Sequence, residues 1–447
     1  MTIKRCLVIA LSLAGCTNLE PGEVDPVQTT EAALNSATPA NPAATDIGVP
    51  TASLPAQFHL PNNVPLRDPL GAATTFSVAG SIDMQGPFFK ELGTNQRTCA
   101  TCHVIDQGWT ISPAATQRIF NASRGTAPIF RTVDGSNSPN ADVSTVRERR
   151  AAFSMLLSRG TIRVGIGIPE GADFELTAVD DPYGFASAAE LSLFRRPLPA
   201  TNLEFVSTVM WDGRISGDTL EAALATQANA ATQGHAQRAT PLDPAVAGEI
   251  VGFEKGLFTA QTFDREVGRL DIDGGHGDAE NLASQAIVAA RWDLFDAYQN
   301  SPDSKYAAIY RGQELFNTRR RTNDKGPCQG CHSQSNVGTN VNGSFFNIGT
   351  SDGARREADQ PLYTLTELST GNVLQTTDPG RALITGKFAD VGRFKPPSLR
   401  GLGARSPYFH GGSARTLADV VAFYSEALEF GFTDEEAADL QAFLAAL

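Results

Sequence analysis

The clearest hydrophobic pattern lies at the carboxyl end of the chain, in the segment FTDEEAADLQAFLAAL. Thr433 stands three residues before Glu436, which is the spacing of a helix capping box. Apolar residues then recur at helical spacing, at Leu440, Phe443, Leu444 and Leu447. The pattern therefore predicts a capped terminal helix with one apolar face.

A second pattern occurs twice. The segment GPFFKELGTNQRTCATCH carries Phe88, Phe89 and Leu92 at helical spacing before a C-x-x-C-H motif. The segment GQELFNTRRRTNDKGPCQGCH repeats this arrangement, with Leu315 and Phe316 in the places of Phe88 and Phe89. We interpret the two segments as an internal repeat, in which a short helix leads into a loop, and the repeat predicts two similar domains.

The pattern between His103 and Trp211 is less helical in character. The segments TIRVGIGI and DFELTAVDD are rich in β-branched residues and bounded by Gly and Pro, so we predict a small β-containing insertion over about 110–195. Further on, DIDGGHGDAEN resembles a metal loop but lacks the terminal Glu of a calcium hand. We interpret it as a solvated loop.

The amino end has the pattern of an export signal. Lys4 and Arg5 precede an apolar run over 7–14, which is too short to remain as a membrane-spanning helix. The run ends in LAGC and resembles the leader of bacterial lipoproteins, so we predict a signal peptide over 1–16 and lipidation of Cys16; an ordinary cleaved signal is the alternative. Residues 17–68, rich in Ala, Thr, Pro and Asn, predict a flexible tether. The expected location is the periplasmic side of the outer membrane, or the cell surface, with the lipid as the membrane anchor.

Composition narrows the function classes. The 447 residues are 41% hydrophobic, which is enough to bury ordinary cores in two or three domains. The net charge of −13 argues against nucleic acid as a partner, because phosphate binding needs clustered Lys and Arg. Of the six cysteines, Cys6 lies in the leader and Cys16 is the lipidation candidate. The other four all lie in the two C-x-x-C-H motifs, so none remains for the disulfides usual in exported proteins.

The C-x-x-C-H motif attaches haem: the two thiols add to the vinyl groups and the adjacent histidine binds iron. The residues of the two motifs are Cys99, Cys102, His103, Cys328, Cys331 and His332. A thioredoxin-like pair is disfavoured because no βαβ pattern surrounds either motif, and zinc sites would need further cysteines. We therefore predict two covalently bound haem c groups.

Five segments, in order, resemble the bacterial dihaem cytochrome c peroxidases and their relative MauG, the enzyme that matures tryptophan tryptophylquinone. The segments are CATCH, MWDGR at 210–214, CQGCH, FKPPSLRGLGARSPYFHGG at 394–412 and TLADVVAFY at 416–424. The resemblance spans about 85–447 and leaves about 110–195 uncovered. It implies a mainly α fold with two cytochrome c-like haem domains, over 69–300 and 301–447, and a small β-containing insertion in the first.

The resemblance also implies roles for single residues. Trp211 matches the tryptophan that relays electrons between the haems, although a buried core indole is the alternative. Tyr424 lies fourteen residues after His410, where peroxidases have a Met and MauG has a Tyr as distal ligand of the second haem. No Met follows Met210, and a Tyr ligand would favour ferric iron. Packing of Tyr424 on its helix remains the alternative.

At the first haem, peroxidases use a Gln and a Glu downstream of W-D-G-R, and the Glu acts as acid and base. Gln227 keeps the first of these residues, but the Glu is missing, and His235 and Gln237 lie at or next to its place. His235 could act as the acid and base, could bind the iron, or could be a surface residue at a helix end.

Three further residues belong to the second haem in this resemblance. Lys395 and Arg400 could neutralise its propionates, and His410 could be structural or a propionate partner. The family also holds a calcium ion between its domains, and Arg405 stands at its Thr position, which puts calcium in doubt. The basic cluster of 319–321 with Lys325 could dock an acidic electron donor, although a solvated face is the better interpretation.

The expected function is that of an exported peroxidase-type oxidoreductase. Electrons from a small redox protein would enter at the second haem and pass by Trp211 to the first, where hydrogen peroxide or another small oxidant is reduced. One alternative is MauG-like or rubber-oxygenase-like oxidation of an organic substrate, and another is a non-catalytic electron carrier. The chain could also form a homodimer.

Overall fold

The computed structural model describes residues 58–447 apart from 323–325. The predicted leader, the lipidation site Cys16, Lys325 and residues 17–57 of the predicted tether lie outside the described residues. Residues 58–68 are not a tether, because they contain strands β1 (His59–Pro61) and β2 (Leu66–Asp68). Within the described part of the chain, no helix is both long and apolar enough to cross a membrane.

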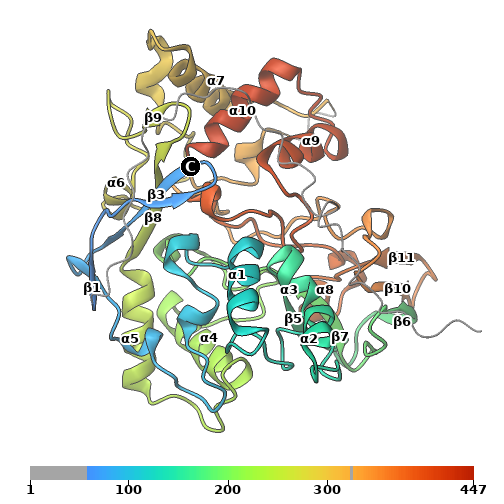
Figure 1. Cartoon of the computed structure of the whole chain (residues 1–447). Coiled ribbons are helices and arrows are strands. Elements are labelled where there is room, and N and C mark those ends of the chain that lie inside the picture. The colour runs from blue at the N-terminus through green and yellow to red at the C-terminus, as the bar shows by residue number, and fades with distance from the viewer. Residues whose placement is uncertain (1–57, 323–325) are drawn as a thin grey trace, which may run out of the picture. The chain divides into compact units, whose positions relative to one another are not determined.

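A four-stranded antiparallel sheet joins the beginning of the described chain to its middle. Its order is β2-β3-β8-β9, with β3 at Gly71–Ser77, β8 at Leu257–Asp264 and β9 at Gly268–Arg269. Strand β1 pairs separately with β4 (Ser81–Asp83). In Figure 1 the β3 and β8 pair runs between α4 (Leu220–Gly234) and α5 (Pro244–Lys255) below and α7 (Ser304–Thr318) and α10 (Asp434–Ala445) above. Strands β3 and β8 are mostly buried, and β8 contacts α5.

The first C-x-x-C-H motif is held by loops and by two helices from later in the chain. A single 3-10 turn, Pro87–Phe89, lies between β4 and the motif, so the helix predicted around Phe88 and Leu92 is reduced to that turn. Helices α4 (Leu220–Gly234) and α5 (Pro244–Lys255) pack against each other beside the motif, and residues of both belong to one apolar cluster with Phe88 and Trp109.

The second motif has the helices that the sequence predicts. Helix α7 (Ser304–Thr318) precedes the motif, and α9 (Leu417–Ala427) and α10 (Asp434–Ala445) follow it. The predicted capping box of Thr433 and Glu436 is present, and the four apolar residues of the terminal segment are buried. Helices α7 and α10 lie side by side in Figure 1 and share an aromatic core with Trp292 and Phe316.

The internal repeat holds at the level of packing, with its register moved by one residue. The rings of Phe88 and His103 are 6.3 Å apart, and those of Phe316 and His332 are 5.9 Å apart. Phe316 is therefore the counterpart of Phe88, and not of Phe89 as the sequence comparison predicted. In each copy one phenylalanine ring packs against the motif histidine.

The insertion is half helical and half β. Its strands β5 (Ile162–Ile166), β6 (Phe174–Asp180) and β7 (Leu191–Arg195) confirm the β prediction. Its first half is helical, contrary to the expected character, with α1 at Pro113–Ser123, α2 at Val146–Ala152 and α3 at Ser154–Arg159. Ser112 caps α1 and Pro113 occupies its first turn, a start signal that the sequence does carry.

The strands of the insertion belong to two different sheets. Strands β5 and β7 pair with each other, but β6 pairs with β10 (Leu362–Glu367), which also pairs with β11 (Val373–Thr376). The two remaining α-helices of the described residues are short: α6 (Ala279–Ala283) and α8 (Ala382–Thr385). The fold is therefore mixed, with more helix than strand, and agrees in part with a mainly α prediction.

Gly312 tests the close contact of α7 with α10. A methyl group at Gly312 would collide with the carbonyl oxygen of Asp439 and would lie 2.8 Å from Cβ of Phe443. We expect Gly312→Ala to lower the free energy of unfolding by about 1–3 kcal/mol, because backbone atoms must move apart. Urea unfolding followed by circular dichroism measures this.

The matched control is Gly252→Ala in α5, where the added methyl group meets nothing within 4 Å. This change should raise the unfolding free energy by about 0.5–1 kcal/mol, because alanine loses less conformational entropy in a helix. Equal stability of the two variants would contradict the packing described for α7 and α10.

Candidate functional site

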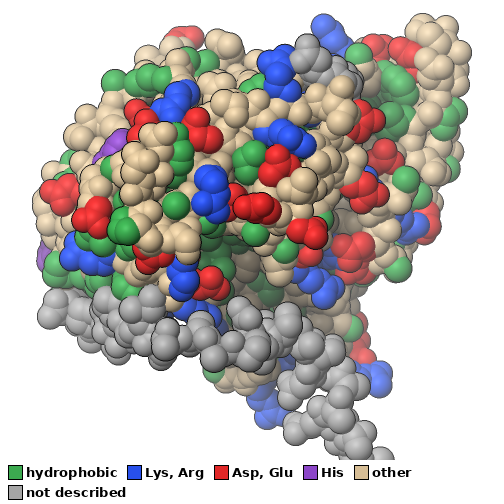
Figure 2. Space-filling view, turned by 90° about the horizontal axis from the view of Figure 1, so that it is seen from above, with side chains coloured by type: hydrophobic (Ala, Val, Ile, Leu, Met, Phe, Trp, Pro, Cys, Tyr) green, Lys and Arg blue, Asp and Glu red, His purple; other side chains and the backbone are tan. Residues whose placement is uncertain are grey.

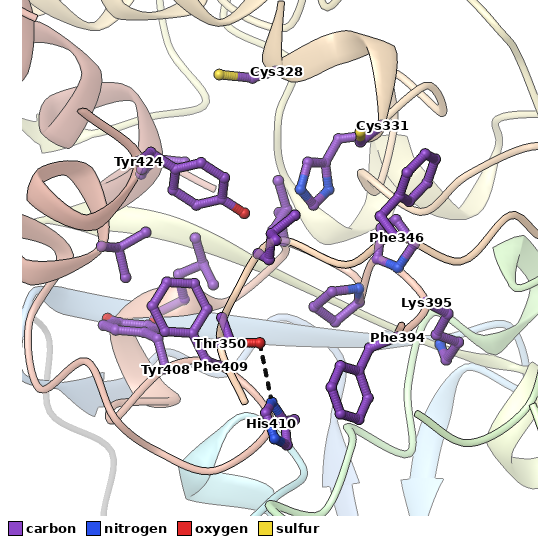
Figure 3. Close-up of a pocket in the computed structure, with 18 of the residues that line it drawn as sticks. Cys328, Cys331, Phe346, Thr350, Phe394, Lys395, Tyr408, Phe409, His410 and Tyr424 are labelled. Atoms are coloured by element: carbon purple, nitrogen blue, oxygen red, sulfur yellow. Dashed lines mark hydrogen bonds between the residues drawn. The ribbon is translucent and has the colours of Figure 1, made fainter. Parts of the chain in front are cut away.

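Each C-x-x-C-H motif lines a cavity of its own. Cys99, Cys102 and His103 line a first cavity of about 180 Å³. The three residues of the second motif line a second cavity of about 420 Å³, shown in Figure 3. The two cavities share one wall, made of Arg196, Pro197, Leu198, Pro199, Trp211 and Lys395.

The motif histidines are held in the same way. Nδ1 of His103 lies 3.0 Å from the carbonyl oxygen of Trp109, and Nδ1 of His332 lies 2.5 Å from that of Gly338. A carbonyl only accepts, so Nδ1 carries the hydrogen and the lone pair is on Nε2. Burial lowers the pKa of His332 to about 4, which keeps this ring neutral at neutral pH. Both rings are thus prepared to bind a metal through Nε2.

The motif cysteines are free thiols and form no disulfide. Burial raises the pKa of Cys99 and of Cys328 to about 12, so neither is a reactive thiolate. Half-buried thiols beside a histidine in an apolar cavity fit a haem c, whose vinyl groups take up such thiols. Within the described residues, no group of three or more His, Cys, Asp or Glu side chains could hold a metal ion by itself.

Lys395 supplies a further test of the fit to haem. Its side chain is buried in the wall shared by the cavities, and its Nζ has no hydrogen bond or ion pair among the described residues. Burial and, after it, the charge of Arg405 lower its pKa to about 8. A buried ammonium group without an anion is costly, and a haem propionate would supply the missing carboxylate.

Arg400 is the other residue that the resemblance assigns to the propionates of the second haem. It is buried but lines neither cavity, and its Nη2 donates to the carbonyl oxygen of Gly277. Its Nε and Nη1 have no hydrogen-bond partner. Arg405 lines the second cavity instead, and donates to the carbonyl oxygens of Arg400 (2.6 Å) and Ser398 (2.8 Å). The positively charged guanidinium of Arg405 therefore already binds these two carbonyl oxygens. Arg405 is the residue for which the resemblance put calcium in doubt.

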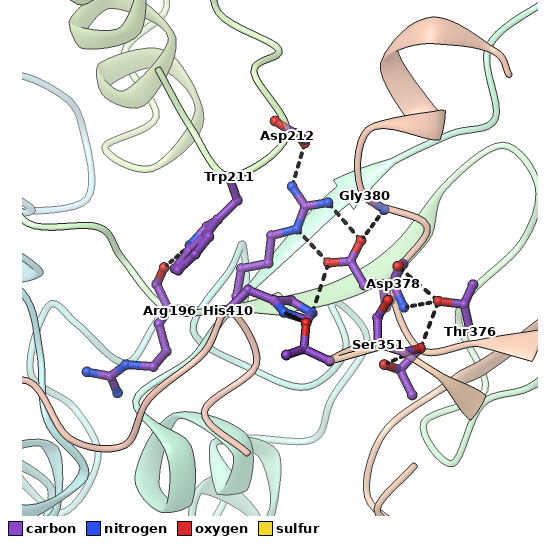
Figure 4. Close-up of polar contacts among 12 residues, drawn as sticks. Arg196, Trp211, Asp212, Ser351, Thr376, Asp378, Gly380 and His410 are labelled. Atoms are coloured by element: carbon purple, nitrogen blue, oxygen red, sulfur yellow. Dashed lines mark hydrogen bonds and ion pairs between the residues drawn. The ribbon is translucent and has the colours of Figure 1, made fainter. Parts of the chain in front are cut away.

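Trp211 lies in the wall between the cavities. Its indole Nε1 donates to the carbonyl oxygen of Arg196 at 2.8 Å, and its own carbonyl accepts from the backbone nitrogen of Lys395 at 3.0 Å. His410 lies beside it, with ring centroids 6.3 Å apart, and stacks on Phe394 at 4.0 Å. Figure 4 shows Trp211 beside Arg196, and His410 facing Asp378, with 3.9 Å between Nε2 of His410 and Oδ2 of Asp378. The structure thus brings Trp211, Lys395 and His410 together.

The residues after Trp211 explain why its position is so firmly determined. Asp212 is completely buried and accepts from Arg195 and Arg214. Arg195 also makes a bidentate pair with Asp378, at 2.6 and 2.8 Å. Burial alone would raise the pKa of Asp212, but the two arginines outweigh it and hold the pKa below its usual value. No pattern in the sequence indicated Arg195 or Asp378, which lie 183 residues apart.

Tyr424 extends from α9 into the second cavity (Figure 3). Its hydroxyl has no hydrogen-bond partner among the described residues, and burial raises its pKa. Its ring lies against Phe409, Phe423 and Phe430. The three phenylalanine rings thus hold the tyrosine ring in place, while its hydroxyl is available to bind a group within the cavity.

Two of the three polar residues predicted at the first haem line the first cavity. Gln227 lies on α4 and His235 is the residue that ends it. Gln237 does not line the cavity: its side chain is exposed, and its amide oxygen accepts from Asn95 at 3.5 Å. The backbone of Gln237 takes a left-handed conformation, with φ of 58°, which directs the chain away after the helix.

Glu254 is a cavity residue that the sequence reasoning missed. It lies on α5, is 7% exposed, and its Oε2 has no hydrogen-bond partner. Burial raises its pKa to about 8, so it is mostly protonated at neutral pH. A signal did exist, because Glu254 continues the buried helical positions of Ala247, Ile250 and Val251.

The raised pKa of Glu254 predicts a pH dependence of stability. The unfolded chain loses this proton near its ordinary pKa of 4.5, whereas the folded protein keeps it up to about 8. Between these values the folded state binds the extra proton, so the unfolding free energy falls with rising pH by up to about 1.4 kcal/mol per unit. Glu254→Gln should remove this fall in urea unfolding series, whereas the exposed Glu249→Gln should retain it. Parallel pH curves for wild type and Glu254→Gln would contradict the assignment.

The chain is similar in sequence to several known oxidoreductases. No family model matches the chain. It is 30% identical over 174 residues to cytochrome-c peroxidase IdrP1 of Denitromonas iodatirespirans, and the alignment covers 34% of this chain and 44% of that protein. It is 27% identical to IdrP2 of the same organism, over 60% of this chain and 74% of the relative. It is 28% identical to the methylamine utilization protein MauG of Methylophilus methylotrophus, over 58% and 70%.

Among solved structures, a MauG-like protein associated with microbial copper homeostasis is 17% identical, with a TM-score of 0.42 over 89% of this chain and 94% of that chain. The chain spans less than half of IdrP1 but more than two thirds of IdrP2 and MauG. The relatives are oxidoreductases. These relatives support the assignment of the chain to the family of bacterial dihaem cytochrome c peroxidases and MauG, which its two C-x-x-C-H motifs and its W-D-G-R segment resemble.

Proposed function

We propose that the chain is a peroxidase-type oxidoreductase that holds one haem c in each cavity and passes electrons from a small redox protein to hydrogen peroxide. The observation that carries this proposal is the single wall, with Trp211 and Lys395, that both cavities share. When bound, the haem irons supply the one-electron steps, and each peroxide takes two electrons and two protons to give two waters. All other parts of the reaction would depend on side chains of the protein.

The motifs would hold the two groups. Cys99 and Cys102 would form thioethers in the first cavity, and Cys328 and Cys331 in the second. His103 and His332 would bind iron through the Nε2 atoms that their carbonyl hydrogen bonds leave free. Lys395 would pair with a propionate, and His410, stacked on Phe394, would shape the side of the second cavity.

The two cavities would have different tasks. Tyr424 presents an unpartnered hydroxyl to the second cavity, which suits a distal ligand that closes this site and favours ferric iron. Gln227 and His235 line the first cavity and are half-buried, which suits a site that a small oxidant enters. Electrons would therefore enter at the second cavity and leave at the first, with Trp211 between them.

The Tyr424 position favours a second candidate function, MauG-like oxidation of an organic substrate. A phenolate oxygen lowers the potential of the iron, and one of the relatives is MauG. Peroxide would still be consumed in that reaction, but the electrons would come from the organic substrate. A peroxide assay with and without a reduced small cytochrome separates the two candidates.

We further propose that the protein is exported and anchored by a lipid on Cys16, which would bring it to the periplasmic side of the outer membrane. The net charge of −13 favours a basic redox partner. Figure 2 shows acidic and basic side chains interspersed on the face in view. The predicted basic cluster is partly used within the chain, because Arg319 pairs with Glu436 and Arg321 lies over the ring of Phe430.

Tyr424→Phe tests the second cavity. Removing the hydroxyl should change the ferric low-spin spectrum of the second haem, because the iron would lose its proposed distal ligand. The matched control is Tyr408→Phe, which lines the same cavity but whose hydroxyl donates to the carbonyl oxygen of Leu402 at 3.0 Å. We expect an altered absorption and electron paramagnetic resonance spectrum for Tyr424→Phe only. An unchanged spectrum would remove Tyr424 from the ligand set.

Peroxide turnover tests the function itself. Wild-type protein with both haems should oxidise a reduced small cytochrome on addition of hydrogen peroxide. His235→Ala should lower this turnover by about 100-fold or more, since a positioned acid and base contributes at that scale. His276→Ala, a half-exposed residue outside both cavities, should leave it unchanged. No turnover in wild type would refute the peroxidase proposal, and equal turnover in His235→Ala would remove His235 from the mechanism.

A further inference from the structure

Three polar side chains from separate parts of the chain meet beside the first cavity. Nδ1 of His235 is hydrogen-bonded to Oδ2 of Asp134, and the other carboxylate oxygen of Asp134 accepts from Nη1 of Arg97. Asp134 is 4% exposed and Arg97 is 3% exposed. Asp134 lies between α1 and α2, in the segment that the family resemblance leaves uncovered. The cluster is therefore a built feature of the fold and not a surface ion pair.

Backbone hydrogen bonds hold the same cluster in place. Nε and Nη2 of Arg97 donate to the carbonyl oxygens of Pro128 and Ile129, each at 2.8 Å. The carbonyl oxygen of His235 accepts from Asn95 at 2.8 Å and from Nη1 of Arg97 at 3.3 Å. Arg97 thus ties both the insertion and the end of α4 to the loop that leads into Cys99. The backbone and the ring of His235 are positioned by the same arginine.

The charge of Asp134 decides which imidazole nitrogen holds the hydrogen. Burial alone would raise its pKa, but the hydrogen bond with His235 and the charge of Arg97 outweigh burial and lower the pKa. An ionised carboxylate has no proton to donate, so Nδ1 of His235 must carry the hydrogen. Nε2 has no hydrogen-bond partner among the described residues, and the ring lines the first cavity.

We propose that Asp134 is a positioning residue for His235 in the first cavity. It holds Nδ1 as the donor and so leaves Nε2 as the atom that takes a proton from an incoming molecule. This inference rests on the proposed function, because it assigns the proton step of peroxide reduction to His235. In that step Nε2 accepts the proton from one peroxide oxygen and returns it to the other, which can then leave as water when the bond between the oxygens breaks. The two electrons that this cleavage takes up would come from the small redox protein of the proposed function, by way of the haems. The imidazole ends unchanged, and Asp134 stays ionised throughout.

Cyanide is the probe that tests this independently of turnover. Hydrogen cyanide must lose its proton when it binds ferric iron, so a positioned base speeds its association. In protein with both haems, His235→Ala should slow cyanide association at the first haem by about 100-fold. Asp134→Asn should slow it by at least about 10-fold, because the neutral amide no longer selects the tautomer. The double variant should be no slower than His235→Ala, since the two residues act as a unit.

The matched control is Asp439→Asn, which removes another carboxylate that pairs with an arginine, Arg311, away from the first cavity. It should leave the cyanide rate unchanged. The proposal is overturned if Asp134→Asn binds cyanide as fast as wild type, or if the double variant is additively slower than both single variants. It is also overturned if His235→Ala binds at the wild-type rate.

A second pair of variants covers the case in which Asp134→Asn does not take up haem. Asp134→Glu keeps the charge but moves the carboxylate, and His235→Asn keeps a donor towards Asp134 but has no atom in place of Nε2. We expect His235→Asn to match His235→Ala, and Asp134→Glu to fall between wild type and His235→Ala. Wild-type rates in both would overturn the proposal.

Peroxide turnover of the same wild-type protein separates the two claims. If turnover is absent but the cyanide rates follow the expected order, the peroxidase proposal fails and the role of Asp134 stands. If turnover is present but Asp134→Asn leaves the cyanide rate unchanged, the peroxidase proposal stands and the role of Asp134 fails.

Discussion

The buried guanidinium of Arg195 is the contact on which the arrangement of the two cavities depends. It lies between Asp212 and Asp378, and all three groups are almost completely removed from water. Loss of one partner would leave an uncompensated charge in the interior, which is far more costly than the net gain from forming the cluster. Asp212 directly follows Trp211, so this cluster also holds the indole in the wall between the cavities (Figure 4). Electron transfer between two sites would need such a fixed wall.

The two cavities repeat one motif but surround it with different side chains. Each motif histidine donates to a backbone carbonyl and packs against one phenylalanine. Beyond this shared base, Tyr424 faces the second cavity, whereas His235 and the buried acid Glu254 face the first. One site is thus suited to storing charge and the other to moving protons, and the difference comes from α9 on one side and from α4 and α5 on the other.

The predictions that held were those with a local cause. A capping box and a 3.6-residue period act within a few turns, so the terminal helix formed where its residues indicated. The β-branched segments at 162–166 and 174–180 are strands, but β6 pairs with β10, nearly two hundred residues later, which no pattern in β6 could indicate. Gln237 and Arg400 do not line the cavities, and the sequence could not indicate this because single polar side chains carry no period. The amide oxygen of Gln237 accepts from Asn95, and Nη2 of Arg400 donates to the carbonyl oxygen of Gly277.

By itself, the sequence determined the chemistry that one turn of chain can present: two thiols and a histidine at each motif, the W-D-G-R segment and the capped terminal helix. Only the tertiary structure decided which side chains face those groups. Asp134 reaches His235 across 101 residues and Arg195 reaches Asp378 across 183, so both contacts depend on how the whole chain folds back. Short spacings are set by covalent geometry and local hydrogen bonds, whereas distant partners are selected by the burial of charge and apolar surface in the complete fold.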